Sequence, residues 1–191
     1  MLKTCGVDIL GMSKSWKKIS SEVIHQNPYF NYKHDVFETS KGIKGDYYYL
    51  ADHNSVFIIP VLDDGRLVLI NTYRYLFNKY GIEFPGGGVK KGQTFEQAAR
   101  EELVEETGFE AREFINIGEF APLNGLSTEV CRVFLARGLV KGKAKPEPTE
   151  EHEVIMRRID EFEDHIKRNE ITDGLTLSAW VLARHHLVQE S

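Results

Sequence analysis

Short alternating runs of apolar and polar residues fill the first third of the chain, a pattern typical of β-strands that bury one face. The expected strands cover residues 22–26, 33–39, 47–51 and 56–62. Turn formers separate them, among them Asn27-Pro28 and Lys41-Gly42. Because Asp-Gly favours tight turns, Asp63-Asp64-Gly65 predicts a hairpin that joins strand 56–62 to a strand over 67–72.

The pattern then changes to helical spacing. Residues 81–88 are rich in glycine and predict a loop, and residues 94–106 predict a helix. Thr94 is the expected N-cap of this helix, and Gly108 stands where a left-handed C-terminal residue belongs. Two further strands and two closing helices are expected, over 114–120, 130–136, 158–169 and 175–187, the last helix starting at Thr172 or Asp173.

This order of elements predicts an α+β fold, an α/β/α sandwich in which a mixed β-sheet lies between helices. We expect it to fill residues 51–191, and a small antiparallel β region to fill residues 1–50. The order shows no internal repeat.

Composition narrows the class of protein. The 191 residues carry 29 Asp and Glu against 24 Lys and Arg, a net charge of -5, which argues against a nucleic-acid partner. Cys5 and Cys131 offer no zinc spacing and fit a reducing compartment. No apolar run approaches the ~20 residues of a membrane helix, and no signal peptide is apparent, so we expect a cytoplasmic protein without a membrane partner.

Three glutamates of the predicted helix carry the clearest chemical signal. Glu102, Glu105 and Glu106 share one face because residues three and four apart are neighbours on a helix. Like charges at this spacing repel, so a cation is expected among them. Oxygen ligands suit Mg²⁺, with Mn²⁺ as the alternative, and the glycine-rich loop lets a backbone carbonyl approach the same point. The competing interpretation is a solvated glutamate-rich face.

The segment over 87–109 resembles the signature of the Nudix hydrolases, GX5EX7REUXEEXGU, in which U is aliphatic or aromatic. The first glycine falls on Gly87, and the metal-binding glutamates fall on Glu102, Glu105 and Glu106. The motif closes on Gly108 and Phe109. The resemblance implies a Nudix fold and an enzyme that cleaves a nucleoside diphosphate linked to another moiety, with Gly87 and the three glutamates as metal ligands.

Two positions depart from this signature. Gln93 replaces its first glutamate, and Glu101 replaces its arginine, which in the family is thought to orient the neighbouring glutamate. Arg100 lies about 100° round the helix from position 101, so its side chain would have to reach the neighbouring glutamate from a different direction. On this basis we expect Glu101→Arg to leave activity unchanged or to raise it.

Flanking residues resemble one subfamily, the ADP-ribose and nucleoside-diphosphate-sugar pyrophosphatases. The runs over 71–87, 120–129 and 170–176 are similar to its QYR…ExPaG, pSPGfsdE and eItDakT segments. The resemblance implies that Arg74 contacts phosphate, that Glu83 binds a second metal or the terminal ribose, and that Pro122 lies near the ADP-ribose group. A surface arginine and a loop-capping glutamate are the alternatives for the first two.

The resemblance also implies a glutamate from a late loop as general base. Glu150, Glu151 and Glu153 lie in the matching polar stretch; we favour Glu153, then Glu151, and the alternative is a solvated acidic loop. Trp16 would stack on a base, as in some relatives, or serve a core or dimer interface. Relatives pair through an N-terminal sheet, so a homodimer through residues 1–50 is expected.

The leading hypothesis is therefore a Mg²⁺-dependent hydrolase of ADP-ribose or a related nucleoside diphosphate sugar. The alternatives are a preference for a sugar nucleotide such as GDP-mannose and an attenuated Nudix module that binds a nucleotide without turning it over. Residues 93–109 hold five glutamates and one arginine, and residues 147–153 hold four glutamates and no Lys or Arg. An anionic pocket of this kind meets an anionic diphosphate only through a divalent metal.

Overall fold

The computed structural model of the chain describes residues 15–51, 53–142 and 152–188. The chain divides into two compact units, Met1–Ala51 and Asp52–Ser191. Each unit has its own sheet or sheets.

The first unit is one antiparallel sheet of three strands in the order β1-β2-β3. The strands are β1 (Lys17–Gln26), β2 (Asn31–Glu38) and β3 (Lys44–Ala51). They confirm the expected strands but begin earlier, because cross-strand pairing extends each one beyond its apolar run. One face carries aromatic contacts, in which Trp16 stacks on Phe37 at 4.7 Å between ring centroids.

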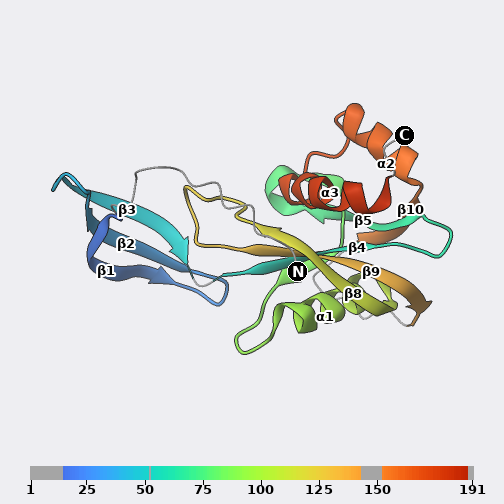
Figure 1. The fold of residues 1–191 in the computed structure, drawn as a ribbon, viewed down its shortest axis with the longest axis horizontal. Helices are drawn as coiled ribbons and strands as arrows, with labels where there is room; N and C mark the ends of the chain where they lie inside the picture. The colour runs from blue at the N-terminus through green and yellow to red at the C-terminus, as the bar shows by residue number, and fades with distance from the viewer. Residues whose placement is uncertain (1–14, 52, 143–151, 189–191) are drawn as a thin grey trace. The chain divides into compact units, whose positions relative to one another are not determined.

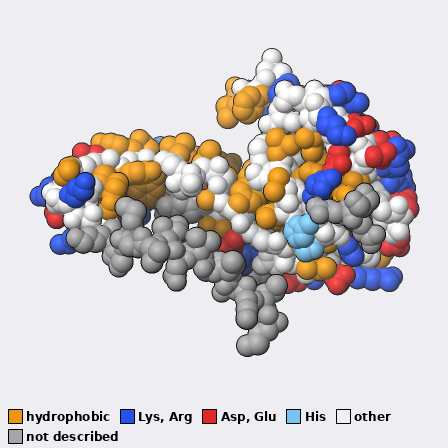
Figure 2. Space-filling view, turned by 45° about the horizontal axis from the view of Figure 1, so that its top comes forward, with side chains coloured by type: hydrophobic (Ala, Val, Ile, Leu, Met, Phe, Trp, Pro, Cys, Tyr) orange, Lys and Arg blue, Asp and Glu red, His pale blue; other side chains and the backbone are white. Residues whose placement is uncertain are grey.

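Much apolar surface of this sheet is exposed to solvent. Every residue of β1 is exposed, including Ile19, Val23 and Ile24. Figure 2 shows hydrophobic side chains gathered over the β1–β3 region. Exposed apolar patches of this kind often mark an interaction surface.

The second unit contains two sheets. A four-stranded sheet has the order β7-β4-β9-β8, and a three-stranded sheet has the order β10-β5-β6. Only the β4–β9 pair is parallel among the described pairs of this unit. The strands are β4 (Ser55–Pro60), β5 (Leu67–Arg74), β6 (Lys79–Glu83), β7 (Gly86–Gly88), β8 (Phe109–Phe120), β9 (Cys131–Lys141) and β10 (His152–Arg157).

Helices cover both faces of these strands, as Figure 1 shows: α1 (Phe95–Thr107) lies on one side, and α2 (Ile159–Lys167) and α3 (Gly174–Leu187) lie on the other. Alternate strand residues serve the two sides, since successive side chains point to opposite faces. Val56 and Ile58 of β4 pack in the cluster that contains Leu103 of α1. Phe57 and Ile59 pack with Trp180 of α3. The predicted α/β/α sandwich is confirmed.

The helix boundaries follow the local capping signals. Thr94 accepts a hydrogen bond from the Gln97 amide at 3.2 Å, and Gly108 ends α1 with a left-handed φ of 70°. Asp173, one of the two expected starts, caps α3 by accepting from the Thr176 amide at 2.7 Å. None of the helices in the described ranges has the length and apolar character needed to cross a bilayer.

Two local predictions were wrong. Residues 81–88 are not a continuous loop, because Gly86–Gly88 pairs with β4 and residues 79–83 pair with β5. The Asp63-Asp64-Gly65 turn forms, but its flanking strands do not continue as a hairpin. They pair only at Val61 and Leu67 and then enter different sheets, in which β4 pairs with β9 and β5 pairs with β10.

Candidate active site

The glutamate face of α1 lies against the glycine strand β7. A Cβ atom added to Gly87 would lie closer than 3.0 Å to the Glu102 carboxylate, so this carboxylate fills the space that a side chain at position 87 would need. The Gly86 amide donates to Glu106 Oε2 at 2.8 Å. Two glutamates of α1 thus meet the backbone of β7, Glu102 at Gly87 and Glu106 at Gly86.

The buried position of Glu106 depends on this backbone contact. Its exposed fraction is 7%, and a carboxylate at this depth requires hydrogen-bond partners. His152 on β10 lies on the same side, with Nε2 at 2.7 Å from the Glu106 carbonyl oxygen. Since a carbonyl oxygen only accepts hydrogen bonds, this geometry places a proton on Nε2 of His152. His152 was missed from the sequence.

The donor set at this point consists of hard oxygen atoms. Glu102, Glu105 and Glu106 carry carboxylates, and the backbone of Gly87 lies against Glu102 and has a carbonyl oxygen of its own. Oxygen donors of this kind suit Mg²⁺ or Mn²⁺. As the side chains stand, no three His, Cys, Asp or Glu residues in the described ranges converge closely enough to hold an ion. The donors fit a divalent cation by the chemistry of their oxygen atoms and by the helix face that the three glutamates share.

Arg74 and Glu83 form a bidentate pair at the ends of β5 and β6. Arg74 Nε donates to Glu83 Oε1 at 2.8 Å, and Nη2 donates to Oε2. Glu83 is 2% exposed, whereas the Arg74 side chain is half exposed. The hydrogen bonds to Glu83, more than any other cause, raise the pKa of Arg74. The buried carboxylate therefore fixes the direction of the guanidinium.

The two residues that depart from the motif contact each other. Gln93 Nε2 donates to Glu101 Oε2 at 2.5 Å, and Lys90 Nζ lies 2.6 Å from Glu101 Oε1. Arg100 does not take the place of the motif arginine. It pairs with Glu96, and its guanidinium lies 4.3 Å from the Phe114 ring centroid. Glu101 thus has a defined role in the packing of the loop, which the sequence did not reveal.

The candidate bases occupy different positions. Glu150 and Glu151 lie outside the described residues. Glu153 lies in β10 and not in a loop, paired in register with Asn71, which corrects the expected placement. Val154 packs on the α1 side and Ile155 on the side of α2 and α3. By strand alternation, Glu153 points to the side of α2 and α3, away from the glutamates of α1.

Two other candidates from the sequence, Pro122 and Trp16, lie in different units of the chain. Pro122 is half-buried in the turn that follows β8. Trp16 belongs to the first unit, where one face of its ring is already stacked on Phe37 and its exposed fraction is 59%. Their contacts with substrate stay predictions.

A polar group at the start of β4 was also missed. The buried Ser55 donates to Glu129 Oε1 at 2.6 Å, and His53 Nε2 lies 3.6 Å from the same oxygen. Residues 54–55 and 129–131 meet here because β4 and β9 are parallel and start together. Only the pairing of two distant strands creates this group, so no local signal could have identified it.

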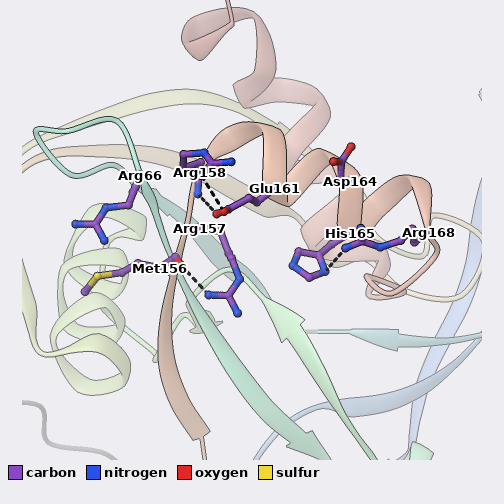
Figure 3. A pocket seen from close by; sticks show the side chains of 8 residues that line it. All are labelled: Arg66, Met156, Arg157, Arg158, Glu161, Asp164, His165 and Arg168. Atoms are coloured by element: carbon purple, nitrogen blue, oxygen red, sulfur yellow. Dashed lines mark hydrogen bonds and ion pairs between the residues drawn. The ribbon is translucent and has the colours of Figure 1, made fainter.

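A separate hollow of about 530 Å³ lies at the opposite end of β5 and β10 from Arg74. Figure 3 shows its side chains, which come from the turn before β5, the end of β10 and α2: Arg66, Met156, Arg157, Arg158, Glu161, Asp164, His165 and Arg168. Most of the cationic groups are paired, Arg66 with Asp64 and Arg158 with Asp160. The hollow contains no residue of the glutamate motif.

Comparison with known proteins agrees with the motif. The sequence profile of the NUDIX domain matches residues 51–176. The chain is 27% identical to the methanol dehydrogenase activator of Bacillus methanolicus, over 85% of this chain and 89% of that protein. It is 29% identical to the ADP-ribose pyrophosphatase of Bacillus subtilis (strain 168), over 65% of this chain and 69% of that protein.

A solved structure shows the same fold. The crystal structure of an ADP compounds hydrolase superposes with a TM-score of 0.80 and 21% sequence identity, over 90% of this chain and 94% of that one. At this identity the likeness concerns the fold alone.

Proposed function

Because the chain belongs to the Nudix family of pyrophosphohydrolases, we propose that it hydrolyses the diphosphate bond of ADP-ribose or a related nucleoside diphosphate sugar. The products would be a nucleoside monophosphate and a sugar phosphate. The observation that carries the proposal is the contact of Glu102 with the Gly87 backbone beside the hydrogen bond from Gly86 to Glu106. These two contacts bring the glycine strand β7 and the glutamates of α1 together at one place.

A divalent cation, Mg²⁺ or Mn²⁺, would be held by Glu102, Glu105, Glu106 and the Gly87 carbonyl. When bound, such an ion neutralises diphosphate charge and lowers the pKa of a bound water. The chain's own part is to keep these oxygen donors in register. The Gly86 amide holds Glu106 by a hydrogen bond, and the missing side chain of Gly87 leaves the space in which Glu102 packs.

Arg74 is proposed to bind a phosphate oxygen. A guanidinium carries five N–H donors, and Glu83 occupies two of them, which leaves Nη1 and one hydrogen of Nη2 for a ligand. In this arrangement Glu83 acts on the substrate through Arg74. Its expected role as a ligand of a second metal or of the terminal ribose stays a prediction.

The general base is proposed to be a glutamate of the acidic stretch before β10. A base must lie within hydrogen-bond reach of the attacking water. The orientation of Glu153 toward α2 and α3 favours Glu150 or Glu151 over it. His152, on the α1 side, is a further group within this region.

A hydrolysis assay tests the proposal directly. ADP-ribose and GDP-mannose are incubated with the protein and Mg²⁺, and the release of AMP or GMP is followed by chromatography. Glu105→Gln should reduce turnover at least 100-fold, because loss of a ligand should cost more than the roughly 10 to 100-fold that follows loss of a group supporting a ligand. Glu96→Gln is the matched control on the exposed part of the same helix and should stay within twofold of wild type. Equal activity of the two variants would contradict the proposal.

The second candidate is a nucleotide-binding module that does not turn its ligand over. One relative is named as an activator of another enzyme, which favours keeping this alternative. Calorimetry with ADP-ribose separates the two functions. Binding without any release of AMP over many hours would establish the module and exclude the hydrolase.

We also propose that two copies pair through the β1–β3 sheet. A second copy would cover the exposed apolar residues of β1, such as Ile19 and Val23. Light scattering after gel filtration should give a dimer mass for wild type and a monomer mass for the double variant Ile19→Glu/Val23→Glu. A monomeric wild type would refute the pairing.

A further inference from the structure

The two departures from the Nudix motif are partners in one hydrogen-bond ring. Gln93 and Glu101 are eight residues apart, and their side chains meet at 2.5 Å. Lys90 closes the ring from the same loop, with Nζ 2.6 Å from the other oxygen of Glu101. Two independent losses from a decaying motif would have no reason to produce complementary contacts.

Both the oxygen and the nitrogen of the Gln93 side-chain amide form hydrogen bonds. Its oxygen accepts from the Lys90 backbone N–H at 3.1 Å, and its nitrogen donates to the Glu101 carboxylate. A backbone N–H only donates and a carboxylate only accepts, so these partners determine the orientation of the amide. A glutamate at position 93 would face Glu101 with a second carboxylate and no donor. Glutamine at 93 is therefore the residue that Glu101 requires.

Lys90 brings a positive charge close to the carboxylates of α1. The hydrogen bond to Glu101 is the main reason that the pKa of Lys90 is raised, and the charges of Glu105 and Glu102 raise it further. The side chains of Lys90 and Glu101 are 57% and 38% exposed, so the ring is accessible to water and its variants should not disturb the core. The ammonium thus lies in the field of several carboxylates of α1.

The ring ties the loop to the helix beside the candidate metal ligands. The loop leaves β7 immediately after Gly87 and Gly88, and Glu101 precedes Glu102 on α1. Holding Lys90 and Gln93 to Glu101 therefore fixes the distance between the two structures that present the Gly87 carbonyl and the Glu102 carboxylate. A 1 Å displacement in such a site costs on the order of 100-fold in rate.

We propose that Lys90, Gln93 and Glu101 are positioning residues that replace the glutamate and arginine of the common motif with a charge-inverted arrangement. In the common motif these two positions carry opposite charges, which would also attract each other across this contact. In this chain the anion is on the helix and the cation comes from the loop. The role assigned here rests on the proposed function, in which Glu102, Glu105 and Glu106 hold a divalent ion.

The arrangement predicts that single changes toward the common motif fail and that the pair of changes succeeds. Glu101→Arg places a guanidinium beside Lys90, and Gln93→Glu places a carboxylate beside Glu101. Each should lower kcat about 10 to 100-fold and weaken Mn²⁺ binding by a similar factor, the usual effect of losing support for metal ligands. The double variant Gln93→Glu/Glu101→Arg should return to within about threefold of wild type in both measurements, because opposite charges again meet.

Lys90→Met and Lys91→Met form a matched pair in the same loop. Lys90→Met should resemble the single variants, roughly tenfold down in kcat with KM little changed, whereas Lys91→Met should behave as wild type. Mn²⁺ affinity is measured by the spin-resonance signal of free Mn²⁺ without substrate. Circular dichroism and the unfolding midpoint establish that each variant folds.

The outcomes separate this inference from the proposed function. Coupled recovery of Mn²⁺ affinity in the double variant supports the ring even if wild type hydrolyses no nucleotide sugar, in which case only the proposed function fails. Full activity of Glu101→Arg alone overturns the inference, and so does a double variant whose loss equals the product of the two single losses. Absence of Mn²⁺ binding by wild type overturns it as well.

Discussion

The Glu102 carboxylate lies against the backbone of Gly87, in the volume that any larger residue at position 87 would occupy. Glycine is needed here for space, since its backbone is part of β7 and carries no positive φ. Gly86 is needed for a different contact, because a Cβ there would approach the Val56 carbonyl of β4. A side chain at position 87 would thus disturb the site, and a side chain at position 86 would disturb the pairing with β4.

Gly87→Ala should damage the site more than the fold. The added methyl displaces the Glu102 carboxylate, and we expect kcat/KM to fall roughly 100-fold, the effect of a displacement of about 1 Å in a catalytic group. The unfolding midpoint should fall only slightly because Glu102 is partly exposed and can move toward solvent. Steady-state kinetics and calorimetry measure the two quantities.

Gly174→Ala is the control for this substitution. Its Cβ would meet no atom within 4 Å, and the residue begins α3. Alanine there should leave turnover unchanged and alter stability by less than about 1 kcal/mol. A Gly87→Ala enzyme with wild-type kinetics would show that Glu102 has no fixed position in the reaction.

Elements held by interactions between nearby residues could be predicted from the sequence, and elements held by pairing with distant strands could not. The helix α1 was predicted to within a residue because Thr94 and Gly108 act on their own immediate backbone. The strand at Gly86–Gly88 was missed because its pairing partner, β4, lies about thirty residues earlier and glycine has low strand propensity. Local sequence signals predict the hydrogen bonds between neighbouring residues and not the pairing of a segment with a distant strand.

The candidate site followed the same rule. The face shared by Glu102 and Glu106 could be predicted from helical spacing, and both residues lie beside the glycine strand β7. The partners of Glu101 could not be read, since Lys90 and Gln93 reach it only after the loop folds back on α1. The expectation that Glu101→Arg is harmless does not take these partners into account, and the contacts of Glu101 with Lys90 and Gln93 are the reason that we propose the opposite effect.

Loss of Arg74 should destabilise the protein by leaving Glu83 buried without its partner. A buried ion pair that loses one member typically costs ~3–5 kcal/mol, and the half exposure of Arg74 reduces our expectation for Arg74→Met to about 2 kcal/mol. The double variant Arg74→Met/Glu83→Gln should recover part of this loss, while turnover should remain low in both. Urea unfolding measures the stabilities. Equal free energies of unfolding for the single and double variants would mean that the carboxylate is not the source of the cost.

The buried thiol of Cys131 should resist alkylation in the folded protein. Burial raises its pKa to about 11, so at about pH 8 only roughly one molecule in a thousand carries the thiolate that reacts. In a Cys5→Ser background, iodoacetamide should label Cys131 only at the rate at which the core opens, and should label it rapidly in urea. Mass spectrometry follows the reaction. Fast labelling of the native protein would show that the start of β9 opens readily.

The His34 ring should make the first unit more stable at mildly acidic than at alkaline pH. Its two nitrogens lie 2.9 Å from Glu22 and 2.7 Å from Asp46, and the hydrogen bond to Glu22, followed by that to Asp46, raises the pKa of His34. A raised pKa in the folded state means that the stabilisation is complete below the ordinary histidine value of about 6.5 and is lost as the pH rises through the folded pKa.

His34→Gln tests this sign, with His25→Gln of the same sheet as control. At about pH 5.5, where both carboxylates remain ionised, hydrogen exchange of the β1 and β2 amides should be faster in His34→Gln than in wild type. At about pH 9 the difference should shrink toward zero, because the neutral ring of wild type no longer attracts two anions. His25→Gln should show no such convergence. A gap between wild type and His34→Gln that widens with pH would mean that the neutral ring, and not the imidazolium, stabilises the sheet.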